Sequence, residues 1–179
     1  HHKCPLTVVK CLNYTHQTKY RLPIAPSPNL PNMKSIYLYP SLCYFEATPV
    51  SVGRGTTLPF QIYGHPDMKG YPYAFTPISK PGAKNPPLLN EHCFGKNLST
   101  LSESAIYKKG IDLSYLIDAY KKLNMKDKFF TSFFEKLVGV DYVRKMIEEG
   151  KTATEIKAKW QNDVKKFKKQ RKPYLLYAE

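Results

Sequence analysis

The sequence lacks long apolar runs and paired-cysteine motifs, and each absence excludes a class of protein. No run of eighteen apolar residues occurs, so we expect no membrane span. No C-x-x-C pair occurs either, which argues against a zinc site or a dithiol redox site. The four cysteines permit three disulfide pairings or none, so free thiols and disulfides both stay open at Cys4, Cys11, Cys43 and Cys93.

Motifs of common enzymes are also missing. There is no G-x-S-x-G motif, and the glycine-rich stretch Gly53–Thr57 lacks the lysine and the spacing of a phosphate-binding loop. The histidines have no metal-ligand spacing. We therefore expect no Ser-His-Asp triad, no metal site and no cofactor. The chain start at His1-His2 shows no basic-then-apolar pattern, so we expect no signal peptide within the sequence.

Acidic residues are scarce. The chain has 14 Asp and Glu residues against 28 Lys and Arg residues, which gives a formal net charge of +14. Residues 1–99 hold 10 basic and 3 acidic side chains, and residues 100–179 hold 18 and 11, so no single tail carries the excess. Such a charge suits a polyanionic partner or simply serves solubility. Because no nucleic-acid recognition motif accompanies it, we expect no nucleic acid partner.

Proline separates two halves with different local structure. Fourteen of the 15 prolines lie in residues 1–99, where β-branched and aromatic runs alternate with Pro- and Gly-rich stretches. This pattern predicts short strands joined by rigid loops. The expected strands are Leu6–Leu12, Ile36–Tyr39, Leu42–Phe45, Pro59–Tyr63, Ala74–Ser79 and His92–Leu98.

Residues 100–179 carry apolar side chains at helical spacing. They predict helices near residues 112–123 and 129–137, the second ending near Gly139. A third helix is expected between Asp141 and Gly150, and a closing strand at Tyr174–Tyr177.

A capping-box pattern at Thr152–Glu155 opens the last predicted helix. This helix carries an apolar stripe that includes Trp160. An exposed tryptophan can serve as a platform for a sugar, but helical spacing with other apolar residues favours a core position. The stripe consists of Ile156, Trp160, Val164 and Phe167.

Together these patterns predict an α/β (α+β-like) fold. We expect a small mixed β-sheet with long Pro- and Gly-rich loops in the first half, and a helical C-terminal half packed on it. Residues 1–24 are expected to be the end of an upstream region or a linker with the first strand. Residues 25–179 are expected to form one domain, with a loop and strand part at 25–99 and a helical part at 100–179.

Glu46 and Arg54 stand out because both lie among small hydroxyl residues on backbone stiffened by proline and glycine. The pair suits either a structural ion pair or a site that holds a polar ligand in one pose, and both roles are compatible. Glycoside cleavage normally needs two carboxyl groups. The other acidic residues of this half, Asp67 and Glu91, lie in ordinary loop contexts, so the chain looks chemically incomplete by itself.

The ordered motifs of the chain are similar to the C-terminal half of the NamZ-type exo-β-N-acetylmuramidases. The resemblance covers nearly the whole chain. It rests on residues 26–31 (PSPNLP), 39–46 (YPSLCYFE), 53–56 (GRGT), 75–77 (FTP), 93–95 (CFG), 129–139, 156–160 and 174–177 (YLLY).

This resemblance implies a function and a partner domain. Family members have an N-terminal Rossmann-like domain with the catalytic glutamate, and they remove N-acetylmuramic acid from the non-reducing end of peptidoglycan fragments outside the cytoplasm. The chain is then expected to supply the walls of the substrate cleft and no catalytic residue. The substrate-binding positions that the resemblance implies are Asn29, Glu46, Ser51, Arg54 and Thr56.

Three positions depart from the family pattern. Ala47, Pro49 and Val52 stand where family members commonly carry Gly, Asn and Glu. Loss of that carboxylate and amide leaves open a second interpretation, in which the chain is a non-catalytic module that binds cell-wall glycans or other partners. The expected partners are peptidoglycan fragments (muropeptides) and the N-terminal domain, and the expected location is periplasmic or secreted.

Overall fold

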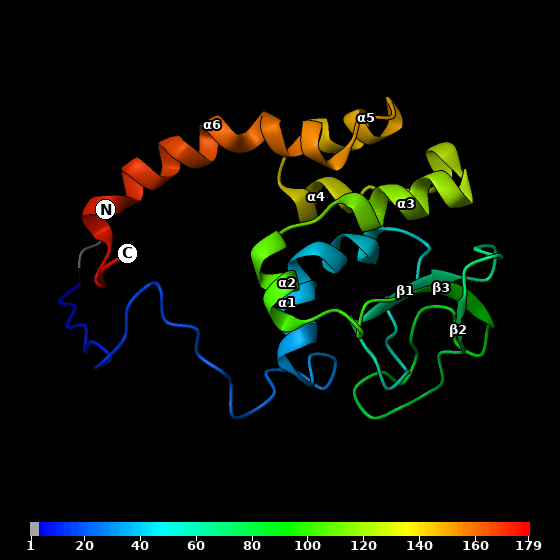
Figure 1. Ribbon diagram of the computed structural model, residues 1–179, viewed down its shortest axis with the longest axis horizontal. Coiled ribbons are helices and arrows are strands. Elements are labelled where there is room, and N and C mark those ends of the chain that lie inside the picture. The colour runs from blue at the N-terminus through cyan, green and yellow to red at the C-terminus, as the bar shows by residue number, and fades with distance from the viewer. Residues whose placement is uncertain (1–3) are drawn as a thin grey trace. The chain divides into compact units, whose positions relative to one another are not determined.

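The structure is a computed structural model that describes residues 4–179, and Figure 1 shows the order of its elements. Residues 1–3, with His1-His2 and the start of the predicted 1–24 segment, lie outside the described residues. The chain divides into two compact units. We call Leu22–Ala158 the main unit, and residues 4–21 with Lys159–Glu179 the terminal unit. The boundary predicted at residues 24 and 25 stays a prediction.

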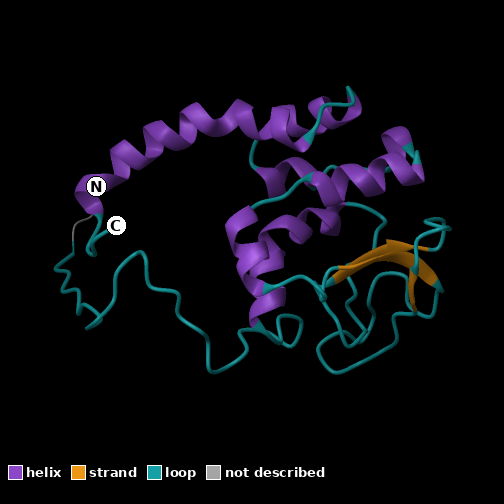
Figure 2. Cartoon of the chain, in the orientation of Figure 1, coloured by secondary structure: helices purple, strands orange, loops and turns teal. Residues whose placement is uncertain are grey.

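The main unit contains one small sheet of three strands, β1 (Ile62–His65), β2 (Tyr73–Phe75) and β3 (Cys93–Asn97), in the order β1-β3-β2. Both pairings are antiparallel, and Figure 2 shows the long loops around the sheet. The predicted fold class is confirmed, although the sheet is antiparallel and not mixed. Residues 4–179 form six α-helices, α1 (Met33–Leu42), α2 (Glu103–Lys109), α3 (Ser114–Leu123), α4 (Phe134–Val138), α5 (Tyr142–Glu148) and α6 (Ala153–Arg171), with short 3-10 turns η1 (Cys43–Ala47), η2 (Lys126–Lys128) and η3 (Lys172–Tyr174).

The strands predicted at Ile36–Tyr39 and Leu42–Phe45 are wrong, because these residues form α1 and η1. Asn32 starts the helix: its side chain accepts a hydrogen bond from Ser35 N at 3.0 Å, and Ser35 Oγ accepts one from Asn32 N at 3.3 Å. Helical spacing then buries Leu38 and Leu42, although Pro40 lies inside the helix. The cap and the buried face together outweigh the missing proline N–H.

The strands predicted at Leu6–Leu12 and Tyr174–Tyr177 are also wrong. Residues 6–12 form no strand, and the side chains of Leu6 and Leu12 are 81% and 89% exposed. A strand needs a partner edge. The terminal unit instead joins its segments by single contacts, such as the 2.9 Å bond from Cys11 N to the Tyr177 hydroxyl and the edge contact of Tyr14 with the Tyr177 ring.

The helices predicted in the second half are found with shifted ends. The helix near 112–123 is α3, and Gly139 ends α4 as predicted. Only part of the 129–137 stretch is helical, although Phe129, Phe130 and Phe134 pack in the core. Asp141 lies at the N-cap position of α5, but its side chain caps no N–H.

The last helix, α6, opens with the predicted capping box: Thr152 N and Glu155 N each donate to the other residue's side chain, at 2.8 and 3.2 Å. Its apolar stripe changes character along the helix. Ile156 is fully buried and Trp160 half-buried, whereas Val164 and Phe167 are exposed. The expected core position is therefore wrong for Val164 and Phe167, at the C-terminal end of the stripe. No helix within residues 4–179 is long and apolar enough to cross a membrane.

The two faces of the sheet are covered differently, because alternate strand residues point to opposite faces. Tyr63 points to the helical side, where its ring stacks on Phe45 at 5.0 Å between centroids. Ile62, Phe75 and Cys93 pack together on the other face, which long loops cover. Loops that carry polar residues are thus held against a small apolar core.

Candidate functional site

The loop after η1 carries most of the predicted site residues, and backbone hydrogen bonds hold it to the sheet. Ser51 and Gly64 exchange two bonds of 2.9 and 3.0 Å, which places the loop beside β1. Ile78 N donates to Gly55 O at 3.0 Å from the far side of the loop. Gly55 has a φ of +80°, and a Cβ there would lie 2.5 Å from Ile78 O. The turn therefore requires glycine.

Glu46 and Arg54 meet at a pocket of about 230 Å³ beside this loop. Arg54 Nη2 donates a hydrogen bond to Glu46 Oε1. The guanidinium carbon lies 5.3 Å from the centre of the Phe60 ring, within range of a cation–π contact. The remaining lining residues are mostly apolar: Phe45, Thr48, Val50, Val52 and Pro87.

Cys43 lies near the same carboxylate, but it is not an activated nucleophile. Burial, and next the charge of Glu46, raise the pKa of the thiol to about 11. The thiol is therefore protonated at neutral pH. All four cysteines are free thiols, with Cys93 buried and Cys4 and Cys11 exposed.

Asn29 and Thr56 line a different pocket, of about 250 Å³, and Gly55 of the same loop also lines it. Asn29 Nδ2 donates to Gly82 O at 3.0 Å, and the Thr56 hydroxyl donates to Gly53 O at 2.7 Å. Both side chains thus also hold the backbone in place. Four of the five predicted residues thus lie in two neighbouring pockets that share this loop.

Ser51 lies in neither pocket. Its side chain is fully buried, and its hydroxyl accepts a hydrogen bond from Gly53 N at 3.2 Å. Its position supports the shape of the loop that carries Arg54. The predicted contact between Ser51 and a ligand stays a prediction, since the buried side chain presents no accessible atom to a ligand.

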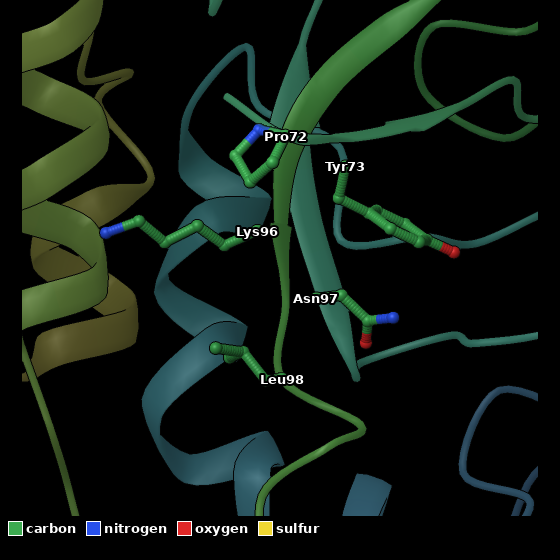
Figure 3. A pocket seen from close by; sticks show the side chains of 5 residues that line it. All are labelled: Pro72, Tyr73, Lys96, Asn97 and Leu98. Carbon is green, nitrogen blue, oxygen red and sulfur yellow. The ribbon is translucent and has the colours of Figure 1, made fainter. Parts of the chain in front are cut away.

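The predictions made from the sequence missed a third pocket, of about 440 Å³, at the ends of β2 and β3 (Figure 3). Pro72, Tyr73, Lys96, Asn97 and Leu98 line it. The sequence signal is weak, since these residues are common in any strand and loop. Only the register of the two strands brings them together.

A polar cluster links the sheet to α3 near this pocket. The Tyr63 hydroxyl donates to Asp118 Oδ2 at 2.8 Å, and Lys96 Nζ lies 3.0 Å from Asp118 Oδ1. Burial and the Asp118 charge raise the pKa of Tyr63 far above its ordinary value. Burial, and then a hydrogen bond with Asp118, raise the pKa of Tyr71 to about 12. Both phenols therefore stay neutral at physiological pH.

The described part of the chain offers no metal centre, because it contains no group of three or more His, Cys, Asp or Glu side chains arranged to hold an ion. His65 Nδ1 accepts a hydrogen bond from Asp67 N at 3.1 Å, and burial lowers the pKa of the ring. This histidine therefore serves the turn after β1.

Residues 37–177 match the family described as Exo-β-N-acetylmuramidase NamZ, C-terminal. The chain belongs to this NamZ C-terminal family. It is 32% identical to the peptidoglycan β-N-acetylmuramidase NamZ of Bacillus subtilis (strain 168) over 189 aligned positions, which cover 96% of this chain and 45% of that protein.

Two solved structures of DUF1343 family proteins from Bacteroides fragilis NCTC 9343 are also similar. The first is 72% identical, with a TM-score of 0.97 over 98% of this chain and 50% of that one. The second is 17% identical, with a TM-score of 0.63 over 86% and 45% of the two chains, and it shares the fold alone. The chain spans about half the length of the Bacillus subtilis protein and of the first Bacteroides fragilis protein.

Proposed function

We propose that this chain is the substrate-binding part of a peptidoglycan-processing glycosidase that releases N-acetylmuramic acid from non-reducing ends. The observation that best supports this proposal is the Arg54 side chain, which lines the pocket of about 230 Å³. N-acetylmuramic acid bears a carboxylate on its lactyl group, and a guanidinium presents paired donors that fit a carboxylate. The Arg54 side chain is 35% exposed, so a ligand can reach it.

The surroundings of Arg54 support this role because they hold the guanidinium in place before a ligand arrives. Glu46 takes a hydrogen bond from Nη2, and the Phe60 ring lies against the guanidinium. Within residues 4–179, Nε and Nη1 of Arg54 make no hydrogen bond, so these donors are left for a ligand. A fixed donor loses less conformational entropy on binding than a mobile one.

Cleavage of the glycosidic bond needs more than this pocket contains. Glu46 is the one carboxylate among the residues that line it. Because glycosidases normally use two carboxyl groups, the cleaving groups would come from a region beyond this chain. An N-terminal Rossmann-like domain, as the family resemblance implies, is the proposed partner. Since muropeptides are the proposed substrate, the proposed location is periplasmic or secreted.

The test uses the protein at the full length of its relatives and measures release of N-acetylmuramic acid from a chromogenic glycoside. We expect Arg54→Ala to raise KM by about ten- to a hundredfold, because a charge-assisted hydrogen bond is lost. Arg171→Ala is the matched control, since Arg171 pairs with Glu179 at the same spacing of eight residues and is similarly exposed. An unchanged KM in Arg54→Ala removes Arg54 from this role.

The single carboxylate at the pocket also fits a second function, a non-catalytic module that binds wall glycans. The same experiment separates the two. A full-length protein that binds muropeptides but releases no sugar supports the binding module. Release of sugar by the full-length protein, lost when this chain is removed, supports the glycosidase.

A further inference from the structure

The pocket at the ends of β2 and β3 is separate from the two pockets beside the loop of Gly55. It shares no lining residue with either of them. Its volume of about 440 Å³ lies in the range of pockets that hold small ligands, roughly 300–1,000 Å³. The pocket therefore has room for a small ligand.

The register of the sheet creates this pocket. Tyr73 lies directly opposite Gly95, and Asn97 follows two residues later on the same face of β3. Figure 3 shows the Tyr73 and Asn97 side chains projecting to the same side, while Lys96 points the other way. A Cβ at Gly95 would lie 1.8 Å from Tyr63 O. The backbone of β1 therefore leaves no room for a side chain at this position of β3, opposite Tyr73.

The two side chains offer a flat apolar surface and a fixed donor. The Tyr73 ring is half-buried and leans on Phe75, with 6.1 Å between the ring centroids. Asn97 Oδ1 accepts a hydrogen bond from Ser99 N at 2.9 Å, which fixes the orientation of the amide. Within residues 4–179 the Nδ2 group of Asn97 makes no hydrogen bond and is left as a donor.

The charge around the pocket favours an uncharged ligand. The Lys96 ammonium is held by Asp118 on α3 and points away from the Tyr73 ring. Pro72 and Leu98 add apolar lining on the side to which Lys96 projects. A pyranose ring has an apolar face that suits an aromatic ring, and its acetamido or hydroxyl oxygens can accept from an amide.

We propose that this pocket is a second saccharide site, which holds an uncharged N-acetylated sugar of the same glycan whose terminal unit binds at Arg54. This inference rests on the proposed function. Two linked sites raise the affinity for a long ligand because the second contact is intramolecular. The protein should therefore prefer long glycan fragments over short ones.

The experiment measures the Kd of full-length protein for a hexasaccharide and a disaccharide of peptidoglycan by calorimetry. We expect Tyr73→Ala to reduce the preference for the hexasaccharide by roughly five- to tenfold, the effect of one aromatic contact. Tyr73→Phe keeps the ring and should retain the preference. Asn97→Asp removes the Nδ2 donor with little change of shape and should reduce the preference for the hexasaccharide. Tyr174→Ala is a control at an exposed tyrosine of the terminal unit.

The outcomes separate the two proposals. The second site is overturned if both variants, Tyr73→Ala and Asn97→Asp, bind the two fragments as tightly as the wild type does. It is also overturned if they lose the same affinity for the hexasaccharide and the disaccharide. Either result counts even if the wild type releases muramic acid. The opposite result is that the wild type releases no sugar, while the variants lose its preference for the hexasaccharide. This result supports the second site and contradicts only the proposed hydrolase activity. Thermal unfolding of each variant shows whether it is folded, and Asn97→Asp tests the site if Tyr73→Ala does not fold.

Discussion

Arg54 donates a hydrogen bond to the Glu46 carboxylate in a pocket whose other lining residues are mostly apolar. The Glu46 side chain is 28% exposed, so water screens the pair. A partly exposed ion pair contributes little to stability, whereas a pair that binds substrate contributes to KM. The structural and functional roles of the pair therefore have different experimental signatures.

We expect Glu46→Gln to lower the free energy of unfolding by less than about 1 kcal/mol. The same variant should raise KM for the muramic acid glycoside, because the acceptor that holds Arg54 in place is no longer a carboxylate, which weakens the hydrogen bond. Urea unfolding and steady-state kinetics measure the two effects. A loss of several kcal/mol with unchanged KM would mean that the pair is purely structural.

The loop beside this pocket depends on Gly55, and a second glycine provides the control. Gly55→Ala places a Cβ 2.5 Å from Ile78 O at a φ of +80°, and we expect it to cost about 2–4 kcal/mol. Gly139 has a φ of +75° with nothing within 4 Å of an added Cβ. Gly139→Ala should therefore cost only about 1 kcal/mol. Equal costs in urea unfolding would show that the contact with Ile78 is unimportant.

The sequence predicted best those parts of the fold that local residues determine. The capping box at Thr152 and the glycine at the end of α4 are local signals, and both appear where predicted. α1 was missed because Pro40 usually stops a helix, and only the cap at Asn32 and burial of Leu38 explain it. The strand predicted at residues 6–12 failed because β-branched residues show strand propensity but not whether a partner strand exists.

The candidate site was predicted in part for the same reason. Glu46 and Arg54 are close in the sequence, so their pairing could be foreseen. The pocket at Tyr73 and Asn97 depends on the pairing of β2 with β3 across the loop of residues 76–92, and composition does not determine this pairing. Ser51 shares a motif with Arg54, yet the bridge to Gly64 turns its side chain to the interior.

Tyr63 and Asp118 connect the sheet to α3 through a buried phenol. Tyr63→Phe removes the 2.8 Å hydrogen bond to Asp118 but leaves the carboxylate paired with Lys96. We expect a loss of about 1–2 kcal/mol in the free energy of unfolding. Tyr37→Phe is the control, since the Tyr37 hydroxyl makes no hydrogen bond within residues 4–179. A similar loss in both variants would contradict a specific role for this bond.

Stability should fall in two stages as the pH decreases, and His65 accounts for the first. Burial lowers the pKa of His65, with the charges of Asp67 and Glu91 opposing it. The unfolded chain then binds the proton more readily, starting near the ordinary histidine pKa of about 6.5. The free energy of unfolding should decline as the pH falls below that value, until the pH passes the lower folded pKa. In His65→Gln this first stage should be missing.

Asp112 accounts for the second stage. Burial alone would raise its pKa, but the hydrogen bonds from Lys109 and Ser114 outweigh burial and leave the pKa below its ordinary value. Its contribution is complete above the unfolded pKa of about 3.9 and is lost as the pH falls through the folded pKa. Urea midpoints measured from pH 8 to pH 3 should show this loss in the wild type. In Lys109→Met the second stage should shrink, because the 2.6 Å contact of Lys109 with Asp112 is removed. A wild-type stability that stays level between pH 5 and pH 3 would contradict this assignment.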